Sequence, residues 1–135
     1  PMPWNDSPQA GFSEGQPWLP IADAHRAKAV AIQDAAPDSI LNATRRFLRW
    51  RKTVPALETG AITFLDAPEP ILAFERAIEG QRLLVVFNLS AHPLQWALPA
   101  GLQASALHGH GLVSAEPATG QLMLPAHGVF YARLE

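Results

Sequence analysis

From residue 57 to the C-terminus, apolar residues recur in short runs with a period of two. Seven such runs, separated by Pro, Gly, Asp and Asn, read GAITFL, PILAFERA, RLLVVFNLS, HPLQWAL, LQASALHG, QLML and HGVFYARL. Alternating side chains of a strand point to opposite faces of a sheet, so each run offers one apolar face to a core. Short strands at this spacing predict an antiparallel β-sandwich of the Greek-key type.

Two of these runs predict where the core lies. Residues 83–87, LLVVF, form an unbroken apolar run, which is typical of a central strand covered on both faces. Trp96 alternates in phase with Leu94 and Leu98, so we expect its indole to point into the core.

One clear helix precedes the strands. Residues 38–53, DSILNATRRFLRWRKT, follow Pro37 and precede Pro55; Asp38 is the expected N-cap and Pro55 the expected stop. On a helical wheel one half is apolar and the other basic. The apolar half holds Ile40, Leu41, Ala43, Thr44, Phe47, Leu48 and Trp50, and the basic half holds Arg45, Arg46, Arg49 and Lys52. The apolar half needs a surface to cover it.

Arg51 interrupts the apolar half of this helix, about 20° from Ile40 on the wheel. A buried guanidinium needs a partner, or must reach past the core to water. We therefore expect a structural role for Arg51, through an ion pair or backbone carbonyls that join the helix to the β domain.

The first 37 residues differ from the rest of the chain in composition and in hydrophobic pattern. They contain Pro1, Pro3, Pro8, Pro17, Pro20 and Pro37 and few periodic apolar positions. This pattern predicts a long irregular loop lying over another surface.

Composition excludes several classes of function. At 135 residues the chain is about one domain long by the usual measure of ~100 to 200 residues per domain. Its 48% apolar content, 16% charged content and net charge of -2 favour a globular protein that binds neither nucleic acid nor a membrane. The absence of cysteine excludes disulfides and thiolate catalysis and agrees with a cytoplasmic location. We expect no metal and no cofactor.

Four short motifs, in order along the chain, carry a family resemblance. They are PMPW at 1–4, AGFS at 10–13, PWLP at 17–20, and PDSIL leading into FLRWRKTVPAL, and they are followed by a strand ending in VVFNLS. This series resembles the C-terminal part of the α-glucosidase and oligo-1,6-glucosidase branch of the α-amylase superfamily, glycoside hydrolase family 13. It departs from the family at Trp50, where the family often has Leu, and in lacking the Arg-Thr pair that precedes PMPW.

The resemblance implies a domain organisation. Residues 1–55 would be the last loop and last helix of a catalytic (β/α)₈ barrel, and residues 56–135 a C-terminal β-sandwich domain. Pro1 would then be a break point inside a longer protein, and the partner of this chain would be the rest of the parent enzyme.

The resemblance also implies an activity. Family enzymes hydrolyse or transfer terminal α-linked glucose with retention, using an Asp nucleophile and a Glu acid/base. None of the twelve acidic residues of this chain lies in a context like the family's catalytic segments. The expected catalytic set within this chain is therefore empty, and the 135 residues alone are predicted to be inactive toward an α-glucoside.

Loops at this end of a barrel line the active site, which makes Trp4 and Asn5 the candidate cleft-lining residues. Trp4 would stack on a sugar face or pin the loop to an apolar surface. Asn5 would bond sugar hydroxyls or satisfy its own backbone.

Other classes of function have weaker support. A free-standing carbohydrate-binding sandwich would use Trp4, Trp96 and Tyr131 as an exposed platform. The two sequons at Asn42 and Asn88 fall inside expected regular elements, so they are interpreted as chance matches. A metal site would use the three histidines His108, His110 and His127, but the glycines of LHGHG favour a turn.

Overall fold

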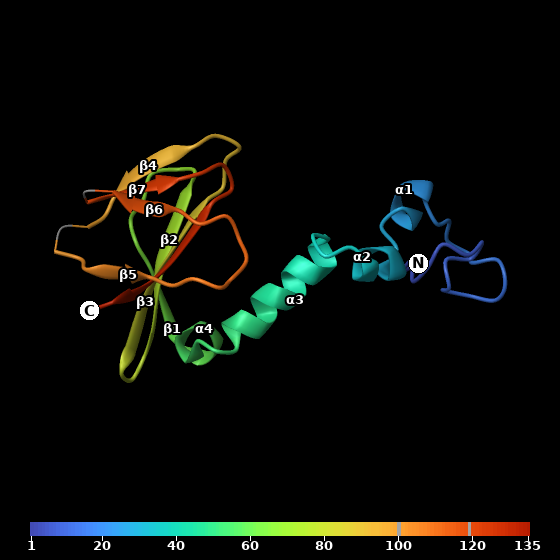
Figure 1. Cartoon of the computed structure of the whole chain (residues 1–135), viewed down its shortest axis with the longest axis horizontal. Coiled ribbons are helices and arrows are strands. Elements are labelled where there is room, and N and C mark those ends of the chain that lie inside the picture. Colours follow the sequence, from blue (N-terminus) through green and yellow to red (C-terminus); the bar gives the residue numbers. More distant parts are fainter. Residues whose placement is uncertain (100, 119) are drawn as a thin grey trace. The chain divides into compact units, whose positions relative to one another are not determined.

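The computed structural model describes residues 1–99, 101–118 and 120–135 (Figure 1). Its contacts divide the chain into two compact units, Pro1–Arg46 and Phe47–Glu135, each described by itself below. The helices are α1 (Asp23–Arg26), α2 (Val30–Ala35), α3 (Ile40–Arg51) and α4 (Pro55–Thr59). The strands are β1 (Ala61–Phe64), β2 (Ile71–Ile78), β3 (Gln81–Asn88), β4 (Leu94–Ala97), β5 (Ala104–Ala106), β6 (Glu116–Ala118), β7 (Gln121–Leu124) and β8 (Val129–Leu134).

The strands form two antiparallel sheets. The larger has the order β1-β2-β3-β8-β5 and the smaller the order β4-β7-β6, and the β4, β7 and β6 arrows lie together in Figure 1. All seven predicted runs form strands, which confirms the antiparallel sandwich. The sequence did not reveal β6, because Pro117 lies within its three residues and proline usually argues against a strand.

The core lies between the two sheets. Leu84 and Val86 of β3 pack there with Trp96 of β4 and Leu122 and Phe130 of β7 and β8. Trp96 is only 7% exposed, which confirms that its indole points inward.

β3 is covered on its other face as well. Leu83 and Val85 are 0% and 1% exposed and belong to a second apolar cluster. Ala56 and Leu57 of α4 lie in that cluster, and Phe47 and Trp50 of α3 pack against it. The prediction of a central strand buried on both faces is confirmed.

Trp50 fastens the end of α3 to the larger sheet. Its Nε1–H donates to the carbonyl oxygen of His108 at 2.9 Å, and its ring meets those of Tyr131 and His110 edge-on, with centroids 5.0 and 5.2 Å apart. Gly109, at φ +90°, passes so close that an added Cβ would lie 3.4 Å from Cδ1 of Trp50.

His110 sits buried in this aromatic cluster, 2% exposed. Its Nδ1 accepts a hydrogen bond from the Leu112 N–H at 3.1 Å, and its Nε2 lies 3.3 Å from Oγ of Ser114. Burial, followed by the charge of nearby His108, lowers the pKa of His110 below its usual 6.5. The folded protein therefore holds this imidazole neutral.

A pH dependence of stability follows from His110. Because its pKa is lower in the folded than in the unfolded chain, its contribution is complete above about pH 6.5 and is lost as the pH falls below that value. We expect His110→Leu to flatten the decline in the free energy of unfolding between pH 7 and 5, measured by urea titration at several pH values. The exposed His92→Leu is the control, and an equal slope in both variants would contradict the assignment.

α3 begins two residues later than predicted, and a different residue caps it. Ser39 Oγ accepts a hydrogen bond from the Asn42 N–H at 3.2 Å and donates to the carbonyl of Gln33 at 2.6 Å. The prediction of Asp38 as the N-cap was wrong. A serine one position further on satisfies the first turn of the helix and also bonds the preceding helix, α2.

The expectation of an irregular loop over the first 37 residues was also wrong in part. The short helices α1 and α2 lie within it. Neither has a side-chain N-cap, and their sequences DAHR and VAIQDA are too short for a clear helical period.

Candidate functional site

The loop that carries Trp4 and Asn5 closes on itself. The backbone N–H groups of Trp4 and Asn5 both point to the carbonyl oxygen of Ala10, at 2.8 and 3.3 Å, and the N–H of Ala10 donates to Ser7 at 2.7 Å. Ala10 and Gly11 have φ of +54° and +64°. Gly11 suits this left-handed conformation, whereas Ala10 adopts it at a cost and is fully buried.

The Asn5 side chain turns into this loop. Its Oδ1 accepts a hydrogen bond from the N–H of Ser7 at 3.0 Å, an Asx turn. Its Nδ2 lies against Gly11, where an added Cβ would stand 2.7 Å from it. The structure therefore gives Asn5 a backbone partner in its own turn, while Trp4 is 52% exposed.

The loop is also held to the helices that follow it. The first N–H groups of α2, on Val30 and Ala31, donate to the carbonyls of Pro3 and Trp4 at 3.0 and 2.9 Å. These bonds satisfy donors that a helix start leaves open, in place of a side-chain cap. From α1, the guanidinium of Arg26 donates hydrogen bonds to the loop carbonyls of Ser7 and Pro8, at 2.8 and 2.7 Å. No local pattern in the sequence marks this contact of Arg26, because it is made across 18 or 19 residues.

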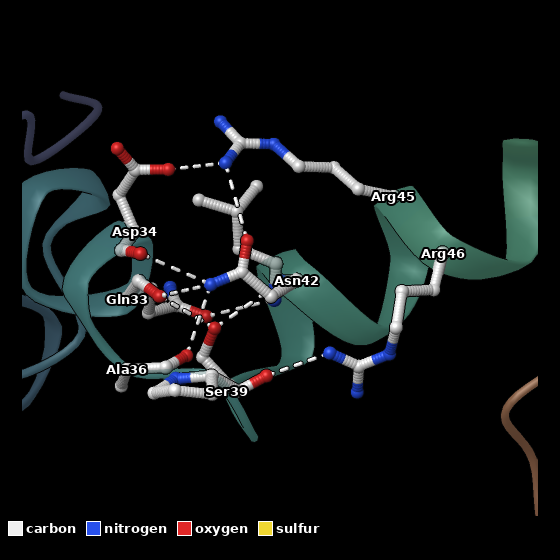
Figure 2. Close-up of polar contacts among 9 residues, drawn as sticks. Gln33, Asp34, Ala36, Ser39, Asn42, Arg45 and Arg46 are labelled. Carbon is white, nitrogen blue, oxygen red and sulfur yellow. Dashed lines mark hydrogen bonds and ion pairs between the residues drawn. The ribbon is translucent and has the colours of Figure 1, made fainter.

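Asn42 joins α2 to α3. Figure 2 shows its Nδ2 pointing to three carbonyl oxygens at the end of α2, those of Gln33, Asp34 and Ala36, at 3.0 to 3.1 Å. Arg45 reaches back to the carboxylate of Asp34 and to Oδ1 of Asn42. Because all polar atoms of the Asn42 amide are engaged in the fold, this sequon is a structural motif.

Arg51 of α3 contacts a backbone carbonyl of α4. Its Nε donates to the carbonyl oxygen of Leu57 at 3.1 Å, which links the end of α3 to α4. Both elements lie against the larger sheet through the second apolar cluster. Arg76 of β2 lines the same region and was not among the predicted site residues. It shares one face of its strand with Phe74 and Ile78, and this alternation is the signal that could have found it.

The structure does not bring together the residues of the two alternative sites, the aromatic sugar-binding platform and the histidine metal site. Two members of the proposed aromatic platform, Trp96 and Tyr131, are 7% and 4% exposed, so they present no sugar-binding surface. Both ring nitrogens of His110 have partners within the fold, and His108 is engaged through its carbonyl. Over the described residues, no group of three or more His, Cys, Asp or Glu side chains is placed to hold a metal ion. In the same part of the chain, no helix is long and apolar enough to cross a membrane.

Two protein families match the chain, one after the other. Residues 1–60 match the family described as Alpha amylase, catalytic domain, and residues 62–131 match the Maltogenic Amylase, C-terminal domain. The second match covers more than half of the chain.

Curated relatives agree with these families. A protein named Probable alpha-glucosidase, from Rhizobium meliloti (strain 1021), is 41% identical over 134 residues, which are 99% of this chain and 24% of that protein. Probable oligo-1,6-glucosidase 2 from Bacillus subtilis (strain 168) is 34% identical, over 79% of this chain and 20% of its own length.

Solved structures give the same result. The alpha-glucosyl transfer enzyme XgtA matches the whole chain with a TM-score of 0.93 and 47% identity, and isomaltulose synthase from Klebsiella sp. LX3 matches it with 0.82 and 28%. In both cases the chain spans 25% of the known structure, about a quarter of the length of the enzymes it resembles. The chain thus belongs, over residues 62–131, to the family described as Maltogenic Amylase, C-terminal domain, and it is a member of the α-amylase superfamily, glycoside hydrolase family 13.

Proposed function

We propose that this chain is the C-terminal part of a retaining α-glucosidase that hydrolyses terminal α-linked glucose or transfers it to an acceptor. One observation carries the proposal: the match to the catalytic-domain family ends at residue 60, and the match to the C-terminal-domain family begins at residue 62. This order and spacing fit a continuous C-terminal piece of such an enzyme, and the named relatives act on α-glucosidic bonds.

Within that enzyme, residues 1–55 would form the last loop and last helix of the (β/α)₈ barrel, and residues 56–135 its C-terminal domain. The partner of this chain is the rest of the barrel, in the cytoplasm. The exposed apolar side chains of α3 support this arrangement, since Ile40 is 77% and Leu48 is 47% exposed. Large apolar side chains along one helix face favour burial against another element.

Trp4 and Asn5 would lie at the rim of the substrate cleft in different roles. Trp4 is half exposed and free to present its ring toward a sugar. Asn5 would act indirectly, since its Oδ1 holds the turn that positions Trp4. Arg51 would be structural, tying α3 to α4 across the domain junction.

The chemistry would be supplied by the barrel. Retention needs a nucleophilic Asp and an acid/base Glu with carboxyl groups ~5 to 5.5 Å apart, so that a glycosyl-enzyme intermediate forms across the gap. Water then gives hydrolysis and a sugar hydroxyl gives transfer. The contribution of this chain would be to shape the loop past which either acceptor enters.

The test is the activity of the full-length enzyme on p-nitrophenyl α-glucoside, followed by ¹H NMR of the first glucose released. We expect the α-anomer, as double displacement requires. No turnover of α-glucosides, or first release of the β-anomer, would contradict the proposal. The 135-residue chain assayed alone is expected to give no turnover.

A further inference from the structure

A pocket of about 150 Å³ opens on the face of the larger sheet that points away from the sandwich core. Phe47, Phe74 and Val85 contribute apolar walls. The polar groups in its lining include the guanidinium groups of Arg51 and Arg76 and the ring of Tyr131. All of these residues belong to the unit Phe47–Glu135.

Arg76 lies in the middle of the sheet without a partner for one of its donors. In β2 it stands opposite Ile62 of β1 and Leu83 of β3. Its Nε is buried and has no hydrogen-bond partner among the described residues. A buried donor of a charged group is costly to leave unmatched, so this atom calls for an acceptor.

The pocket carries positive charge that its own walls do not balance. Arg51 bonds only the neutral carbonyl of Leu57, and neither it nor Arg76 forms an ion pair within the described part of residues 47–135. Arg82, by contrast, pairs with Glu75 at 2.8 Å on the neighbouring strands. Burial raises the pKa of Tyr131 to about 12, so its phenol stays protonated and adds no negative charge.

The surface beside the pocket indicates what kind of molecule covers it. Phe64 of β1 pairs with Phe74 in the sheet and packs edge-on against it, with ring centroids 5.9 Å apart. Phe64 and its neighbour Ile62 on the same face are 65% and 48% exposed. An apolar surface that continues from a cationic pocket suits a protein element with an acidic side chain, because a free small anion would leave the aromatic groups in water.

We propose that this pocket receives the carboxylate of a Glu or Asp side chain from the catalytic barrel of the parent enzyme, which pairs with Arg76 and Arg51. The carboxylate would accept from Nε of Arg76, and its aliphatic stem would lie against Phe47 and Phe74. This contact between the barrel carboxylate and the two arginines, called the latch below, would hold the C-terminal domain against the barrel near the end of α3. This inference rests on the proposed function, because it needs a barrel upstream of residue 1.

The test uses the full-length enzyme and a matched pair of arginines. Arg133 lies in the same cross-strand row as Arg76, on the other side of Leu83, but is exposed. We expect Arg76→Met to lower the melting temperature by roughly 5 °C, because it leaves a buried carboxylate unpaired. Arg133→Met should lower it by less than about 1 °C. Arg76→Lys keeps the charge and should lose less than Arg76→Met.

The partner is then found by double-mutant cycles. Each acidic residue on the barrel surface is replaced by its amide, in the wild type and in Arg76→Met. One replacement should destabilise the wild type but restore part of the stability lost in the variant, because it removes the unpaired buried charge. If no acid couples to Arg76, or if Arg76→Met behaves like Arg133→Met, the latch does not exist.

A free anion is the competing occupant. If 100 mM acetate raises the melting temperature of the wild type more than that of Arg76→Met at constant ionic strength, the pocket is an open anion site and the proposal is overturned. Glucosidase turnover by the wild type is measured in parallel. If the enzyme turns over α-glucosides but no barrel acid couples to Arg76, only the latch is rejected. If the enzyme shows neither turnover nor coupling, the proposed function is rejected as well.

Discussion

Replacement of Asn88 by Asp is expected to lower the free energy of unfolding by about 4 kcal/mol. Asn88 is 2% exposed, and its Nδ2 donates to the carbonyls of His92, Leu124 and Pro125 at 2.7, 3.4 and 2.8 Å. Aspartate removes these donors and directs a buried negative charge at three carbonyl oxygens. Urea-induced unfolding at pH 7 measures the difference.

Asn42→Asp is the matched control for this substitution. Asn42 also bonds three carbonyls, but it is half-buried and its Oδ1 lies 3.2 Å from Nη1 of Arg45, which would stabilise a carboxylate. We expect a loss of about 1 kcal/mol there. Equal losses at the two positions would show that burial of Asn88 does not decide its contribution.

Truncation of Trp50 to Ala is expected to cost about 3 kcal/mol, at the lower end for a large aromatic side chain because Trp50 is only half-buried. The substitution removes the edge contacts with Tyr131 and His110 and the bond to the carbonyl of His108. It should therefore release the end of α3 from the larger sheet. Urea-induced unfolding gives the size of the loss, and amide exchange at residues 47–51 locates it.

Trp50→Phe separates the two contributions. Phenylalanine keeps most of the ring contact and loses the hydrogen bond, so we expect a loss of about 1 kcal/mol. A loss in Trp50→Phe as large as that in Trp50→Ala would mean that the hydrogen bond, and not the packing, dominates this contact.

The sandwich was predictable because its signals are local. Alternation within a strand determines which side chains face the core, and the unbroken run 83–87 predicted a strand, β3, that is buried on both faces. Neither inference needs knowledge of which strands pair. β6 was not predicted, because a segment of three residues with a central proline is too short to show the alternation that distinguishes a strand from a loop.

The contacts that hold the N-terminal loop were not predictable in the same way. Arg26 reaches carbonyls 18 and 19 residues away, and α2 is capped by carbonyls of Pro3 and Trp4 instead of by its own side chains. Such bonds depend on where the folded backbone brings its polar groups, which no short window of sequence contains. Arg76, by contrast, could have been identified from the sequence. It is a charged residue that alternates with Phe74 and Ile78 on one strand face, so its guanidinium needs a hydrogen-bond acceptor.

The central claim, that the apolar half of α3 lies against a barrel preceding this chain, is tested most directly by thiol labelling of the full-length enzyme. The 135 residues contain no cysteine, so Ile40→Cys, Leu48→Cys and Arg49→Cys each introduce one reactive site in this part, resolved by peptide mass spectrometry. Exposure of Ile40 and Leu48 in this chain is 77% and 47%. We predict that both cysteines at these positions react at least about tenfold more slowly than the one at Arg49 in the native enzyme. Equal reaction rates at all three positions would contradict the claim.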